Sequence, residues 1–108
     1  MVSEKTIKEA VERLVKSGNP KQIFLFGSYA RGDARERSDL DFLVIPQKVE
    51  NRRKEMVRLY DVLRSMRIPV DILVASERTF HEWEDVAGTI FYEIKREGRL
   101  CYDASKIS

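Results

Sequence analysis

The sequence lacks the features that mark a secreted, a membrane-bound or a strongly basic protein. A single cysteine, Cys101, excludes an intrachain disulfide and provides no zinc-ligand spacing. No apolar run approaches the roughly 18–20 residues of a membrane span, and the polar N-terminus does not look like a signal peptide. The net charge is only +2, which excludes a polycationic nucleic-acid binder. We therefore expect a cytoplasmic protein with no membrane partner and no direct nucleic-acid partner.

What the sequence does have is the composition of a small globular protein. Of its 108 residues, 43% are hydrophobic and 35% are charged, which suits a soluble chain with one modest core. Repeats, low-complexity tracts and interdomain linkers are missing. We expect a single domain over residues 1–108, with its core at about 6–102.

Hydrophobic periodicity predicts the secondary structure of most of the chain. Helices are expected over residues 3–17, 50–66 and 89–97, and strands over 22–26, 39–45, 70–74 and 100–102. The first strand is apolar on both faces, which predicts a place inside the sheet, whereas the last is expected at an edge. The helix between the second and third strands has the spacing of a βαβ unit, so these two strands belong in one sheet.

Several segments carry weaker expectations. Gly18 is expected to take the left-handed turn that ends the first helix. Ser76 can cap a short helix, but residues 80–88 look irregular and the tail 103–108 looks frayed. The aromatic residues Phe80, Trp83 and Phe91 could form an interface with a partner subunit or a second small cluster within the domain. The interface is favoured, because so small a core can hardly bury every aromatic residue.

The most informative stretch begins where the first apolar run ends. The run Ile23–Phe26 is followed at once by Gly27 and Ser28. Gly27 allows backbone to approach a ligand closely. A short helix starting near Ser28 would offer free backbone N–H groups and a hydroxyl, which together make a phosphate seat. Arg31 is positioned either to bind phosphate or to pair with Asp33 or Glu36 at the surface.

Two carboxylates open the second strand. Asp39 and Asp41 follow Ser28 after ten intervening residues, and strand alternation places both on one face, roughly 6.5–7 Å apart. The opposite face carries Leu40, Phe42 and Val44, which a core can cover. Because two like charges side by side repel each other, a shared divalent cation would relieve them, and oxygen ligands suit Mg²⁺ best.

A third carboxylate interrupts the third strand. Asp71 lies within the apolar run Val70–Val74, where a lone carboxylate is costly unless it is paired or metal-bound. Three carboxylates on adjacent strands beside a phosphate seat indicate phosphoryl chemistry with two metal ions. In this scheme Asp39 and Asp41 hold the metals against a nucleoside triphosphate. Asp71 ligates the metal beside the attacking hydroxyl and can take its proton.

These residues carry a family resemblance. Gly27-Ser28, ten residues, then Asp39-x-Asp41 resembles the motif of the DNA polymerase β-like nucleotidyltransferases. With Ala30-Arg31-Gly32 and Ser38 the chain looks like the minimal nucleotidyltransferase (MNT) branch, and Asp71 falls at the family's third carboxylate. Position 29, often basic in similar sequences, is Tyr29 here. The resemblance covers about residues 6–102.

The resemblance implies a fold and an activity. It implies an α+β fold of α/β type, with a mixed sheet of three to four strands and helices packed against it. It also implies ATP as substrate, two Mg²⁺ ions, and site residues Gly27, Ser28, Arg31, Asp39, Asp41 and Asp71. Many such proteins act as antitoxins that transfer AMP to a tyrosine of a HEPN-family toxin, so a HEPN toxin is the expected partner.

Two alternatives stay open on the sequence. The protein could neutralise its partner by contact alone, although retention of three mutually repelling carboxylates argues against an unused site. It could instead modify a small molecule, as aminoglycoside adenylyltransferases do. The missing second, acceptor-binding domain weighs against that alternative.

Overall fold

The structure is a computed structural model that describes residues 1–106. Its elements, in chain order, are α1 (Glu4–Gly18), β1 (Gln22–Phe26), α2 (Ser28–Arg31), β2 (Leu40–Ile45), α3 (Arg52–Leu63), the 3-10 helix η1 (Arg64–Met66), β3 (Val70–Val74), α4 (Glu77–Trp83), α5 (Ile90–Glu97), β4 (Arg99–Asp103) and the 3-10 helix η2 (Ala104–Lys106). Within these residues no helix is both long enough and apolar enough to cross a membrane.

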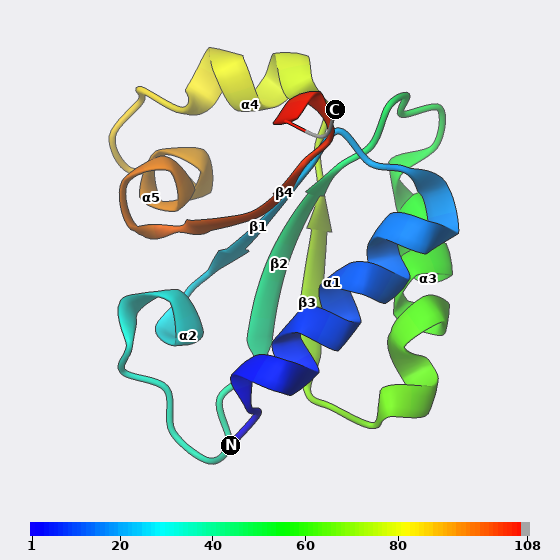
Figure 1. Ribbon diagram of the computed structural model, residues 1–108. Helices are drawn as coiled ribbons and strands as arrows, with labels where there is room; N and C mark the ends of the chain where they lie inside the picture. The colour runs from blue at the N-terminus through cyan, green and yellow to red at the C-terminus, as the bar shows by residue number, and fades with distance from the viewer. Residues whose placement is uncertain (107–108) are drawn as a thin grey trace.

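The four strands form one mixed sheet in the order β3-β2-β1-β4. Strand β1 runs antiparallel to both β2 and β4, whereas β2 and β3 run parallel. Figure 1 shows α3 leading from β2 back to the start of β3, as a parallel connection requires. The predicted α+β fold is confirmed, as are the interior place of the first strand and the edge place of the last.

Helices α1 and α3 cover one face of the sheet (Figure 1). Leu40, Phe42 and Val44 of β2 are buried on this face, as strand alternation predicted. Leu14 of α1 and Leu59 of α3 pack into the same cluster. This face holds the larger of two hydrophobic cores.

Helices α4 and α5 cover the other face, where the smaller core lies (Figure 1). Leu43 and Ile45 of β2 are buried there with Phe80 of α4 and Ile94 of α5. The expectation of one modest core was therefore incomplete, because the sheet buries both faces at this end. Asp41, the remaining β2 residue on this face, is half-buried.

The expectation of an irregular segment at 80–88 was wrong for its first part. Ser76 caps α4 by accepting a hydrogen bond from the Thr79 N–H, and the helix continues to Trp83. Phe80 stacks on Phe24 with ring centroids 5.3 Å apart, and Phe91 meets Phe80 edge-on. The predicted aromatic interface is thus wrong for Phe80, which the second core buries. Trp83 is 46% exposed.

The end of α1 and the C-terminal segment also differ from expectation. Asn19, not Gly18, takes the left-handed conformation after α1, which asparagine tolerates better than most residues. The frayed tail predicted from residue 103 is wrong for residues 103–106, because Asp103 ends β4 and Ala104–Lys106 form η2. The Gln22 side-chain amide donates to Asp103 and holds this end against β1. Residues 107–108 of that prediction lie outside the described residues.

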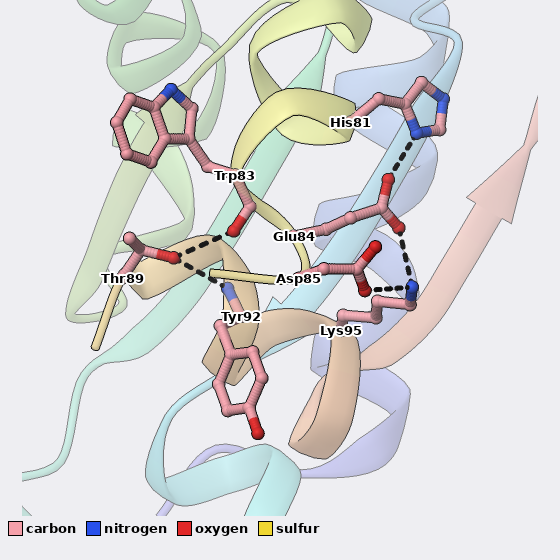
Figure 2. A network of polar contacts seen from close by, with 7 residues as sticks. All are labelled: His81, Trp83, Glu84, Asp85, Thr89, Tyr92 and Lys95. Atoms are coloured by element: carbon pink, nitrogen blue, oxygen red, sulfur yellow. Dashed lines mark hydrogen bonds and ion pairs between the residues drawn. The ribbon is translucent and has the colours of Figure 1, made fainter. Parts of the chain in front are cut away.

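A polar network fixes the corner between α4 and α5 (Figure 2). Thr89 caps α5 by accepting from the Tyr92 N–H, while its hydroxyl donates to the Trp83 carbonyl. Lys95 pairs with Glu84 and Asp85 at 3.1 and 2.9 Å. The network holds α5 at a defined position over the sheet, and α5 borders the candidate site.

Candidate active site

The predicted site residues meet where β1 ends and β2 and β3 begin (Figure 1). Asp41 lies opposite Phe26 in the antiparallel β1–β2 pair and beside Asp71 in the parallel β2–β3 pair. Neighbouring strands are about 4.8 Å apart, and residues in register point to the same face. A hydrogen bond from the Leu40 N–H to the Pro69 carbonyl holds the two strand starts together. The structure thus brings Asp41 and Asp71 side by side.

Gly27 lies against the carboxylate of Asp41. Its φ angle is +73°, which side-chain-bearing residues rarely adopt. A Cβ atom at this position would lie 2.2 Å from Asp41 Oδ2. Only glycine therefore allows the turn after β1 and the Asp41 carboxylate to occupy adjacent space, which explains why Gly27 belongs to the site.

Ser28 begins the four-residue helix α2 directly after this turn. The Ser28 carbonyl accepts from the Gly32 and Asp33 N–H groups, which closes the turn behind α2. The Ser28 hydroxyl makes no hydrogen bond within the described residues. The predicted short helix is confirmed, and the phosphate-binding roles of Gly27 and Ser28 remain predictions.

Asp41 has the most perturbed carboxyl group near the site. Burial first, and then the negative charges of Asp71 and Asp39, raise its pKa from 3.8 to about 6. Glu93 raises it further, whereas the positive charge of Arg31 lowers it. Raised carboxyl pKa values from burial and like charges are typical of functional sites. The cluster is therefore short of positive charge.

Asp71 is exposed but held in place by Tyr60 of α3. The Tyr60 hydroxyl donates to Asp71 Oδ1 at 3.2 Å and accepts from the Ile72 N–H at 2.9 Å. Burial, together with the charges of Asp71 and Asp39, raises the pKa of Tyr60, so the hydroxyl keeps its proton. Asp39, just before β2, is exposed and contributes to both pKa shifts.

Arg31 is engaged by carboxylates on two elements. Its guanidinium pairs with Asp33, as one of the two alternatives expected, and with Glu93 and Glu97 of α5. The Nη1–Oε1 distance to Glu93 is 3.1 Å. Arg31 lies close enough to Asp41 for its positive charge to lower the pKa of that carboxyl. A contact between Arg31 and a substrate phosphate remains a prediction.

Tyr29, where similar sequences often have a basic residue, has a structural contact instead. Its hydroxyl accepts a hydrogen bond from the Val2 N–H at 2.9 Å, and its ring packs against the larger core. Tyr29 thereby ties the start of the chain to α2. His81, the only histidine, lies at the surface, where its ring pairs with Glu84 and not with a carboxylate of the candidate site.

The donor set is suited to a hard cation. All three candidate ligands are carboxylates, and Mg²⁺ commonly takes one or two carboxylates together with waters and substrate phosphates. Across residues 1–106, no group of three or more His, Cys, Asp or Glu side chains could hold a metal ion, so the structure does not gather all three predicted carboxylates around one ion. The residues thus fit an ion held by Asp41 and one neighbour, with the remaining oxygens supplied by substrate and water.

The comparison with protein families agrees with this geometry. The family described as "Polymerase beta, Nucleotidyltransferase" matches residues 5–107. The chain belongs to this family. It is a nucleotidyltransferase by family and by fold, as the motif from Gly27 to Asp41 predicted.

One relative by sequence and one solved structure match nearly the whole chain. A Methanocaldococcus jannaschii protein named "Putative protein adenylyltransferase" is 33% identical over 104 residues, which cover 94% of this chain and all of the relative. The crystal structure of a "putative nucleotidyltransferase" from Sulfolobus solfataricus has a TM-score of 0.62 and 28% identity, and the match covers 94% of this chain and 81% of that one.

A further solved structure shares the fold. It is described as a tri-AMPylated Shewanella oneidensis HEPN toxin in complex with its MNT antitoxin. The TM-score is 0.58 at 16% identity, and the match covers 95% of this chain and 75% of that one. At this identity the likeness concerns the fold of the nucleotidyltransferase alone.

Sequence reasoning missed two residues that border the site. Tyr60 drew no functional expectation from the sequence, yet its hydroxyl reaches Asp71. Glu93 lies on α5, far along the chain from the motif, and pairs with Arg31 beside Asp41. Neither carries a local signal, because each reaches the site only through packing of its helix on the sheet.

Proposed function

We propose that this protein transfers AMP from ATP, with Mg²⁺, to a tyrosine hydroxyl of a HEPN-family toxin and so acts as its antitoxin. The observation that carries the proposal is the Asp41 carboxylate lying against the Gly27 turn and beside Asp71. The protein-adenylyltransferase name of a relative at 33% identity supports the reaction class. The partner is inferred from the shared MNT fold and motif.

The substrate triphosphate is assigned to the turn after β1. Its terminal phosphates would lie against the backbone of Gly27 and the hydroxyl of Ser28, where Asp41 is within reach. Arg31 would reach a phosphate by exchanging its Glu93 partner for the nucleotide. Mg²⁺, held by Asp41 with Asp39 or Asp71, would neutralise the phosphate charge and polarise the phosphorus centre.

The chemical step is an in-line displacement at the α-phosphorus. The acceptor oxygen forms a bond to this phosphorus, and the bond from phosphorus to the bridging oxygen of the β-phosphate breaks. Pyrophosphate leaves with that bonding pair, and the hydroxyl proton passes to a base. Asp71 is the assigned base, since Tyr60 bonds its Oδ1 and its Oδ2 has no hydrogen-bond partner within the described residues.

The test is the intact mass of a HEPN-family toxin, the proposed partner, after incubation with this protein, ATP and Mg²⁺. We expect a gain of one or more AMP units that requires Mg²⁺ and is lost in the double variant Asp39→Asn/Asp41→Asn. A matched control, Glu50→Gln/Glu82→Gln, removes two exposed carboxylates whose only ion pairs within the described residues are with Lys48 and Arg78, and it should retain transfer. Peptide mapping then identifies the modified side chain.

Other outcomes would contradict parts of the proposal. A gain in mass that persists in the Asp39/Asp41 variant would contradict the catalytic assignment. A stable complex without any gain would indicate an antitoxin that acts by contact alone. Transfer to a residue other than tyrosine would leave the reaction in place and correct the acceptor.

A further inference from the structure

Helix α1 carries a row of alternating charges that the site does not use. Glu4, Lys8, Glu12 and Lys16 are four residues apart, so they follow one another along the helix and alternate in sign. All four are exposed. Of these four residues, only Glu4 forms an ion pair within the described part of the chain, and its partner is Arg99 of β4. The other three charges are without an ionic partner in the described part of the chain.

The charged row borders an apolar groove between α1 and the edge strand β4. The groove has a volume of about 450 Å³, and its floor includes Val11, Val15 and Cys101. Val15 and Cys101 are half-buried. An apolar floor with a charged rim is the usual composition of a protein–protein interface.

The order of the charges is self-complementary. If a second copy of α1 lies antiparallel beside the first, with the two-fold axis level with Ala10, Glu4 faces Lys16 of the other copy. Lys8 then faces Glu12 of the other copy, and two-fold symmetry repeats both pairs. The row spans about 18 Å at 1.5 Å per residue and winds about 40° around the helix at each step. The Lys8–Glu12 pairs would therefore lie at the centre of a crossed helix–helix contact, with the Glu4–Lys16 pairs toward its ends. A parallel arrangement would instead place like charges together.

We propose that the α1–β4 groove is a homodimer interface in which α1 packs antiparallel against α1 of a second copy. In this dimer the two copies contact each other through α1. The edge strand β4 is poorly suited to pairing with a strand of the second copy. Its register with β1 shifts between Ile23 and Phe24, and bulges of this kind protect sheet edges from pairing. The site at the start of β2 stays outside the contact, so dimerisation leaves it open.

The test uses two variants with opposite charge on the row. Lys8→Glu/Lys16→Glu makes the row entirely acidic, and Glu4→Lys/Glu12→Lys makes it entirely basic. By sedimentation, the wild type should show twice the 12.6 kDa mass of one chain. Each variant alone should dimerise about 100-fold more weakly, because four attractive pairs become repulsive. An equimolar mixture of the two variants should restore a dimer.

A control separates the interface from total charge. Lys5→Glu/Lys54→Glu makes the same charge change at two exposed lysines outside the row and should leave the dimer intact. Circular dichroism checks that each variant is folded. A monomeric wild type at high micromolar concentration would overturn the proposal. So would a dimer that survives in both row variants, or a mixture that fails to associate.

Discussion

The two faces of the sheet differ in what the same strand contributes to each. On the face under α1 and α3, every β2 residue is apolar and buried. On the face under α4 and α5, Leu43 and Ile45 are buried, whereas Asp41 at the start of the strand is half-buried and charged. The first face is core along its whole length. The second changes from core to candidate active site within three residues.

The difference shows how a chain of this size supports both a stable fold and a costly site. The larger core lies where no catalytic side chain is needed. The smaller core ends at Leu43, which is the next β2 residue after Asp41 on the same face, so the carboxylate is partly desolvated without being enclosed. Burial and then the like charges of Asp71 and Asp39 raise the Asp41 pKa to about 6, which means that the ionised carboxylate works against folding.

The largest expected effect separates the two cores. Leu14→Ala, in the larger core, and Phe80→Ala, in the smaller one, should each lower the free energy of unfolding by about 3 kcal/mol in urea denaturation. Activity per folded molecule should stay unchanged in the first variant. In the second it should fall, because α5 positions Glu93 beside Arg31. Equal activity in both variants would contradict the idea that the smaller core supports the site.

The next effect concerns the turn at Gly27. Gly27→Ala should lower AMP transfer by about 100-fold, because the new methyl group would displace the Asp41 carboxylate. Gly88→Ala is the matched control: Gly88 also has a positive φ, of +92°, but open space where the Cβ would lie. The control shares the backbone strain and should retain transfer. Steady-state kinetics on both variants checks this.

A smaller effect is expected when the hydrogen bond from Tyr60 of α3 to Asp71 is removed. Tyr60→Phe removes the hydroxyl that bonds Asp71 and the Ile72 N–H, and it should lower kcat about tenfold with little change in KM for ATP. Tyr92→Phe is the control, since the Tyr92 ring contact with Arg96 survives without a hydroxyl. An unchanged kcat in Tyr60→Phe would show that Asp71 needs no orienting partner.

The smallest effect is the cost of the Asp41 charge. Because its folded pKa of about 6 exceeds the ordinary 3.8, the folded state binds its proton more tightly, and stability is lost as the pH rises through 6. Asp41→Asn should therefore stabilise the metal-free protein at pH 8 by about 1 kcal/mol, after allowance for partial exposure. Below pH 4 the gain should disappear. Urea denaturation in EDTA at several pH values measures it.

Local patterns in the sequence were enough for much of the fold. Alternation in β2 predicted the buried face of Leu40 and Phe42, and the hydrophobic periodicity over residues 50–66 predicted α3 with η1. The short helix at Ser28 followed from one glycine and its neighbours. Local signals identified Ser76 as the cap of α4 but not the length of the helix, and Phe80 looked surplus because its partner Phe24 lies far away in sequence.

The sequence by itself determined the parts of the site that are close along the chain. Gly27 and Ser28 follow directly on β1, and Asp39 lies just before β2, close enough for its charge to raise the pKa of Asp41. Only the tertiary structure decided that Asp71 lies beside Asp41, that Tyr60 bonds it and that Glu93 pairs with Arg31. The physical reason is that strand register and helix packing join residues that no local spacing relates. They depend instead on how the whole chain buries its two cores.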